Sequence, residues 1–229
     1  MVNDQYPKRP MDEVEKLADE LNTDYTSSIG PALTIPIPVE DIAEHFLGYS
    51  IDITNEGLFS DPNFLGGIDF EQNLIYVNAS VEDHDGRYAF TVAHEIGHHV
   101  LHREAYLNDK EQGKREILCR DSGEKPQIEI EADRFAAALL MPSSVVLETF
   151  NRIKPKPKAS TIGQARGVAN EVIKEGGFSN VSNTAMINRL IDLGAIKAAY
   201  QNGLVHKGHR GSLITRMVRG TLAKLKSFR

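Results

Sequence analysis

Four histidines and one glutamate lie in the thirteen residues of "FTVAHEIGHHVLH", from Phe90 to His102. In an α-helix each residue advances about 100°, so His94 and His98 share one face, one turn apart. Two imidazoles at this spacing can bind one metal ion. Glu95 is placed to reach a metal-bound water rather than the metal itself. The pattern His-Glu-x-x-His therefore predicts a catalytic metal site with Glu95 as the general base.

The other two histidines of this segment are less suitable as metal ligands. His99 is rotated about 140° from His94 and is predicted to be a bystander. His102 lies one turn beyond His98 and could approach the site, but a third ligand from elsewhere in the chain fits better. The alternative interpretation is a solvated helix face rich in histidine. Apolar neighbours favour a buried helix, whose polar groups need a partner such as a metal. These neighbours are Val92, Ala93, Ile96 and Val100.

A second helical segment, "QIEIEADRFAAALLMP", can supply the third ligand that a catalytic zinc site needs. Glu129 and Asp133 are four residues apart and share a face, whereas Glu131 lies about 200° round from Glu129. We expect Glu129 to bind the metal. We expect Asp133 to accept a hydrogen bond from a ligand histidine and so determine its tautomer. Glu131 is expected to face solvent or form a salt bridge, and the alternative for the whole segment is an ordinary amphipathic helix.

The elements around these two helices follow from apolar spacing and turn residues. The histidine helix should begin between Val81 and Arg87. Before it we expect two helices, at 10–22 and 39–47. We also expect three strands, in "YSIDIT", "FLGGIDF" and "LIYVN". Residues 103–126 are polar and are predicted to form a long surface loop. Farther on, we expect a helix that Ser143 caps and that runs to about Ile153, a helix at 162–174, and a helix at 183–193 with Ser182 as its cap.

The last two predicted helices resemble a helix-turn-helix, but the second offers Arg189 as its single basic side chain. A packing or partner-docking role is therefore favoured over direct nucleic-acid binding. Four regions are predicted: an N-terminal helix and linker (1–34), a metal-binding domain (35–153), a helical region (154–200) and a basic tail (201–229). The tail could steer an acidic partner or nucleic acid, or could form a docked terminal helix.

Composition excludes several classes of protein. The 229 residues have a net charge of −6, which argues against a protein that coats nucleic acid. No apolar run approaches the length of a membrane span, and the first residues lack the apolar core of a signal peptide. The single cysteine, Cys119, cannot form an internal disulfide, so a cytoplasmic location is expected.

The segments "YAFTVAHEIGHHVLH" and "EIEADRFAAALLMP" together resemble the ImmA/IrrE-type metallopeptidases, over residues 35–197. The resemblance implies an α+β fold: a minimal zincin-like core with a small mixed or antiparallel sheet packed on the active-site helix, plus a helical C-terminal region. It also implies a zinc-dependent endopeptidase of the bacterial cytoplasm or of a mobile element that cleaves a helix-turn-helix repressor. By resemblance the metal ligands are His94, His98 and Glu129, and the catalytic glutamate is Glu95. Manganese remains an alternative to zinc.

Zincin-like sites hold an extended substrate by pairing it with an edge strand. Leu74–Asn78 is the predicted strand, with Leu74, Tyr76 and Asn78 facing the substrate, and Tyr106 or His102 could stabilise the oxyanion. An alternative function is a non-catalytic zinc module that regulates a DNA-binding partner by binding it. An open ligand position disfavours this alternative, since structural zinc sites are usually closed.

Overall fold

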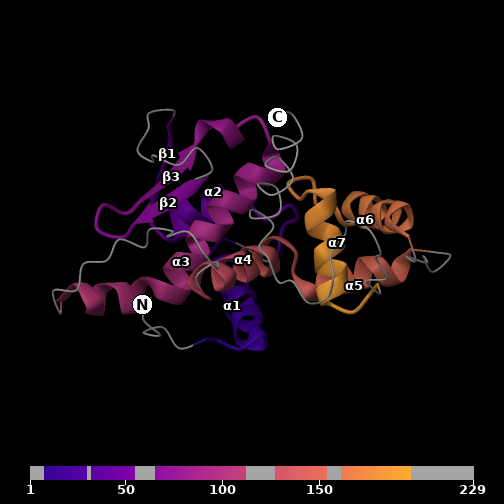
Figure 1. Cartoon of the computed structure of the whole chain (residues 1–229), viewed down its shortest axis with the longest axis horizontal. Helices are drawn as coiled ribbons and strands as arrows, with labels where there is room; N and C mark the ends of the chain where they lie inside the picture. Colours follow the sequence, from indigo (N-terminus) through magenta and orange to yellow (C-terminus); the bar gives the residue numbers. More distant parts are fainter. Residues whose placement is uncertain (1–7, 30–31, 55–64, 112–126, 154–160, 197–229) are drawn as a thin grey trace, which may run out of the picture.

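The computed structural model describes residues 8–29, 32–54, 65–111, 127–153 and 161–196. Its elements, in chain order, are α1 (Met11–Ile29), α2 (Val39–Asp41), the π-helical turn η1 (Ile42–Phe46), β1 (Ser50–Thr54), β2 (Gly66–Asp69), β3 (Leu74–Asn78), the 3-10 turn η2 (Ala79–Val81), α3 (Asp85–Glu111), α4 (Gln127–Leu140), α5 (Ser143–Arg152), α6 (Ile162–Gly176) and α7 (Asn183–Asp192). The expected α+β fold with one small mixed sheet is confirmed (Figure 1). The predicted basic tail (201–229) and residues 112–126 of the predicted loop lie outside the described residues.

The sheet has the strand order β1-β3-β2, with β3 parallel to β1 and antiparallel to β2. The prediction that β3 is an edge strand is therefore wrong, because both of its sides are paired. Ile75 and Val77 of β3 are fully buried. The alternation in "LIYVN" revealed this buried face, but alternation carries no information about which strands lie on either side.

The two helices that carry the predicted ligands, α3 and α4, pack closely against each other between the sheet and α1 (Figure 1). Gly97 of α3 permits this approach, since a Cβ there would lie 3.2 Å from both Cα and O of Ala132. On the far side of α4, the Asn22 side chain of α1 donates a hydrogen bond to the Leu139 carbonyl.

Three predicted boundaries are corrected. Helix α1 continues to Ile29, because Tyr25 extends its buried stripe. Hydroxyl side chains such as Thr23 donate to carbonyls one turn earlier, so they have partners within the helix. Helix α3 continues to Glu111, so residues 103–111 are not loop. This stretch consists mainly of good helix formers and contains neither glycine nor proline. Ser143 is the first residue of α5 and not its cap, which is Pro142.

The C-terminal helices α6 and α7 pack on each other, and α7 is tied to the rest of the fold by Arg189. This side chain is 4% exposed and donates from Nε to the Met141 carbonyl at 2.9 Å. Its guanidinium also pairs with the Glu15 carboxylate of α1. Arg189 is thus engaged within the fold and is not available to bind phosphate. No helix within the described ranges combines the length and the apolar character needed to cross a membrane.

Candidate metal centre

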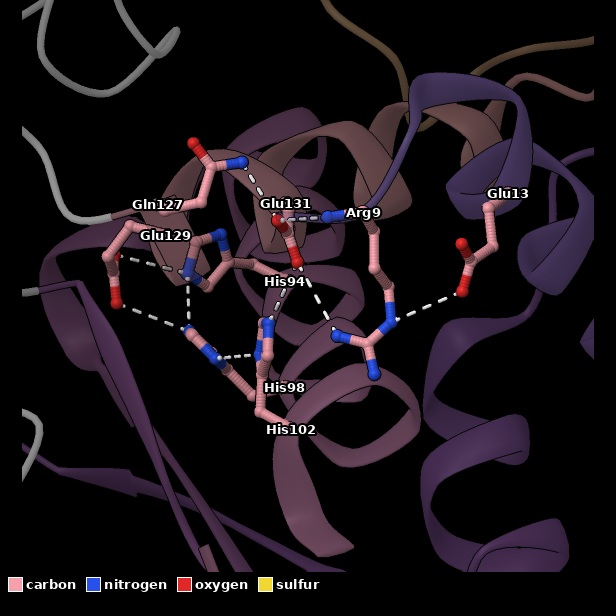
Figure 2. Close-up of polar contacts among 8 residues, drawn as sticks. All are labelled: Arg9, Glu13, His94, His98, His102, Gln127, Glu129 and Glu131. Carbon is pink, nitrogen blue, oxygen red and sulfur yellow. Dashed lines mark hydrogen bonds and ion pairs between the residues drawn. The ribbon is translucent and has the colours of Figure 1, made fainter. Parts of the chain in front are cut away.

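The side chains of His94, His98 and Glu129 meet at one buried point between α3 and α4, and we call these three residues the ligand cluster (Figure 2). Nε2 of His94 lies 3.1 Å from Nε2 of His98. The Glu129 carboxylate oxygens lie 3.5 Å from the first of these nitrogens and 3.3 Å from the second. Three potential ligand atoms from two helices therefore face one common point.

The ligand cluster fits a tetrahedral ion. Zinc binds nitrogen and oxygen at about 2.0–2.2 Å, which places neighbouring ligand atoms of a tetrahedron about 3.3–3.6 Å apart. The two histidine nitrogens are 3.1 Å apart, and the carboxylate oxygen that faces each of them lies at 3.5 or 3.3 Å, close to this range. Two imidazoles and one carboxylate also form a donor set typical of catalytic zinc, in which the fourth position is open. The residues are those that the sequence predicts as ligands.

Asp133 lies on the other side of the His94 ring. Its Oδ1 atom is 3.0 Å from His94 Nδ1, and it comes from α4, one turn after Glu129. Burial acts to lower the pKa of His94, but the carboxylates of Asp133 and Glu129 outweigh it and raise this pKa to about 10. Burial conversely acts to raise the pKa of Glu129, but contact with His94 and His98 lowers it well below its usual range.

The remaining histidines of α3 lie away from the ligand atoms. His102 is fully buried, and its Nδ1 is 3.0 Å from Nδ1 of His98, behind the ligand ring. Burial, followed by the charges on His98 and Arg9, lowers the pKa of His102 to about 3, so this ring is neutral. Its position behind the ligand ring, against His98 Nδ1, does not favour the interpretation of His102 as an oxyanion donor. His99 is outside the ligand cluster, as expected, and its Nδ1 lies 2.8 Å from the Tyr49 hydroxyl.

Tyr106, the other suggested oxyanion donor, packs beside Phe70 with ring centroids 5.1 Å apart. It lies eight residues after His98, or roughly 12 Å farther along the helix axis, beyond the reach of its phenol group. Glu131 is 1% exposed, so the solvent-facing alternative is wrong and the salt-bridge alternative is confirmed. Its partner is Arg9, at 3.6 Å. Sequence reasoning missed Arg9, because no local pattern connects residues so far apart in the chain.

The predicted base, Glu95, is 5% exposed and lies next to the first residue of β2. A Cβ on Gly66 would come within 3.2 Å of Glu95 Oε1 and 2.5 Å of Thr91 Cγ2. The absence of a side chain at Gly66 therefore lets β2 approach the base directly. Among the described strands, β2 is the edge strand nearest to Glu95.

The outer edge of β2 carries backbone groups that point away from the sheet, whereas the backbone groups of β3 are paired on both sides. Asn78 N–H donates to the Leu65 carbonyl, so in this antiparallel pair Gly66 and Ile68 direct their backbone groups away from β3. The predicted substrate contacts of Leu74, Tyr76 and Asn78 need correction. The backbone of β3 is paired on both sides, and these three side chains alternate with the buried Ile75 and Val77 and so lie on the face away from α3.

One family model matches this part of the chain. Residues 50–175 match Peptidase_M78, the IrrE N-terminal-like domain. The match spans more than half of the sequence and includes the sheet, α3 and α4. Helix α1 and the segment before it lie outside it. No curated protein sequence matches the chain significantly.

Proposed function

Because the chain belongs to the Peptidase_M78 family of IrrE N-terminal-like domains, we propose that it is a zinc-dependent endopeptidase. Its proposed substrate is a helix-turn-helix transcriptional repressor in the bacterial cytoplasm, and cleavage would relieve repression. The observation that carries the proposal is the convergence of His94, His98 and Glu129 on one point, with Glu95 directly after His94 in the same turn of α3. A metallopeptidase needs this combination of three ligands and one base.

Each residue of the site has a distinct proposed role. His94, His98 and Glu129 hold the ion. Zinc supplies Lewis acidity, which lowers the pKa of water from about 15.7 towards about 7 and polarises the scissile carbonyl. Glu95 accepts the proton of the attacking water and delivers it to the leaving amine. One water is thereby added across the peptide bond, which becomes a carboxyl group and an amine. Asp133 keeps the ring of His94 oriented, with Nε2 directed to the ion.

The geometry of β2 supports an extended substrate. Gly66 and Ile68 offer outward-directed backbone groups beside Glu95. A peptide that pairs with this edge would run along the sheet and pass the base and the ligand cluster. Specificity would then depend on alternate side chains of the peptide. The same backbone pairing serves many sequences, so the strand alone does not select one repressor.

The test is cleavage of candidate repressors by the purified, zinc-loaded protein. Small helix-turn-helix proteins from the same genome, beginning with any encoded by an adjacent gene, are incubated with it, and the fragments are identified by mass. We expect one repressor to be cut at a defined bond. Glu95→Gln should retain its zinc and lose about 10²- to 10⁴-fold in cleavage rate.

Two results would contradict the proposal. Equal cleavage by wild type and Glu95→Gln would remove Glu95 from the mechanism. Relief of repression that persists in Glu95→Gln, without any fragment, would instead favour the non-catalytic module that acts by binding its partner. Zinc content, measured by elemental analysis, ensures that both proteins are compared with the site filled.

A further inference from the structure

Behind the ligand cluster, a chain of polar side chains runs from His98 to the N-terminal segment (Figure 2). His98 Nδ1 lies 3.0 Å from His102 Nδ1, and His102 Nε2 lies 3.5 Å from Glu131 Oε2. His102 is fully buried and Glu131 is 1% exposed. A buried histidine and a buried carboxylate are costly to desolvate unless they have partners, so their alignment behind a predicted ligand calls for an explanation.

The chemistry of imidazole determines which nitrogen of His98 and of His102 carries the proton when His98 binds a metal. When His98 offers the lone pair of Nε2 to an ion, its proton is on Nδ1. That N–H can donate to His102 Nδ1 only if the His102 proton is on Nε2. The Nε2–H of His102 then faces the Glu131 carboxylate, whose Oε2 lies 3.5 Å away, in electrostatic contact and farther than in a full hydrogen bond. A carboxylate at this place favours the one pair of tautomers in which His98 can bind a metal.

Glu131 is held in place by hydrogen-bond donors from two separate segments of the protein. Gln127, at the start of α4, donates from Nε2 to Glu131 Oε1 at 2.8 Å. The backbone N–H of Arg9 donates to the same oxygen at 3.0 Å, and the Arg9 guanidinium lies 3.6 Å from Oε2. Arg9 precedes α1 and is outside the residues that match the family model. The N-terminal segment thus supplies two of the contacts that hold Glu131, which is the buried residue of this series farthest from His98.

We propose that His102 and Glu131 are positioning residues for the ligand His98, and that Arg9 anchors them, so that docking of the N-terminal segment and metal affinity are coupled. This inference rests on the metal site of the proposed function and not on cleavage. It assigns a role to a segment that the family match does not include. Coupling of this kind is reciprocal: docking raises metal affinity, and the metal strengthens docking by the same factor.

The first experiment measures zinc affinity by competition with a chromophoric chelator, using the full chain. Glu131→Gln preserves side-chain volume, and we expect it to bind zinc about 10- to 100-fold more weakly than wild type. At Arg9 a graded order is expected: Arg9→Lys close to wild type, Arg9→Ala weaker, and Arg9→Pro weakest, because proline also removes the backbone donor. Lys16→Ala is the control, since this exposed α1 side chain pairs with Glu20 and not with the residues that link His98 to Arg9.

The second experiment is hydrogen exchange of α1 amides with and without zinc. We expect zinc to slow exchange in α1 more than in α6 in wild type, and this excess to disappear in Glu131→Gln. A purely structural Glu131 would lower stability without abolishing the zinc-dependent difference.

The outcomes separate this inference from the proposed function. Wild-type zinc affinity in both Glu131→Gln and Arg9→Pro would overturn the positioning role, even if the protein cleaves a repressor. Conversely, loss of affinity in these variants would support the role even if no repressor is cleaved. Failure of the wild type to bind zinc would overturn both proposals. Circular dichroism of each variant establishes that it is folded before its affinity is interpreted.

Discussion

Nδ1 of His94 lies 3.0 Å from Oδ1 of Asp133, on the side of the imidazole opposite the ligand cluster. A single turn of α4 therefore contacts both nitrogens of one ring, because Glu129 faces Nε2. The two carboxylates have different roles. Glu129 is placed to bind an ion, while Asp133 is placed to hold the proton of the ligand ring on Nδ1.

The first prediction concerns this contact. Asp133→Ala should weaken zinc binding about 10- to 100-fold, because the His94 ring loses the acceptor that orients it. Asp133→Asn, which retains a carbonyl acceptor, should lose less. Competition with a chelator measures both affinities. Glu104→Ala, which removes an exposed carboxylate from α3, is the matched control and should bind zinc as wild type does.

The second prediction concerns pH. Since the pKa of His94 is raised to about 10 in the metal-free protein, this ring is protonated near neutral pH. Zinc must displace that proton, so its apparent affinity should rise with pH, by about tenfold per unit between pH 6 and 8 for one proton released. Calorimetry in buffers of different ionisation enthalpy counts the protons. An affinity that does not change over this range would contradict the prediction.

The third prediction tests the edge of β2. Ile68→Pro should lower cleavage of a repressor about tenfold, because it removes one backbone donor that pairs with an extended substrate. Ile68→Val, which retains the donor, is the control. Both variants should keep their zinc, measured by elemental analysis. If Ile68→Pro cleaves as fast as Ile68→Val, the substrate does not pair with this edge.

The fourth prediction concerns the contact between α3 and α4. Gly97→Val should lower the free energy of unfolding by about 1–3 kcal/mol, because its side chain would overlap Ala132 and Phe135. Gly167→Val is the matched control in α6, where no other atom lies within 4 Å of the Cβ position. Urea unfolding of the metal-free proteins gives both values. Similar losses in the two variants would show that the contact between α3 and α4 is not responsible.

The fifth prediction concerns Arg189. Arg189→Met should lower the free energy of unfolding by about 2 kcal/mol, because Glu15 and the Met141 carbonyl lose their common donor. Arg166→Met, at an exposed position of α6, should change it little. Thermal melts of the two variants provide the comparison. An unchanged melting temperature for Arg189→Met would mean that water replaces these contacts without cost.

Much of the site was predictable because it depends on local periodicity. A helix determines that His94 and His98 share a face, and that Glu129 and Asp133 share another. The same reasoning located the three strands and most helices. It placed the end of α3 too early because polar residues were equated with loop, although their helix propensity is high.

The amino-acid sequence alone determined the helices, the face on which each candidate ligand lies, and the resemblance to a family. Only the tertiary structure decided that β3 is central, that His102 and Glu131 lie behind His98, and that Arg9 and Arg189 bind carboxylates far away in the chain. The reason is physical. Backbone geometry repeats over a few residues and leaves a pattern, whereas strand order and buried ion pairs depend on how whole elements pack together.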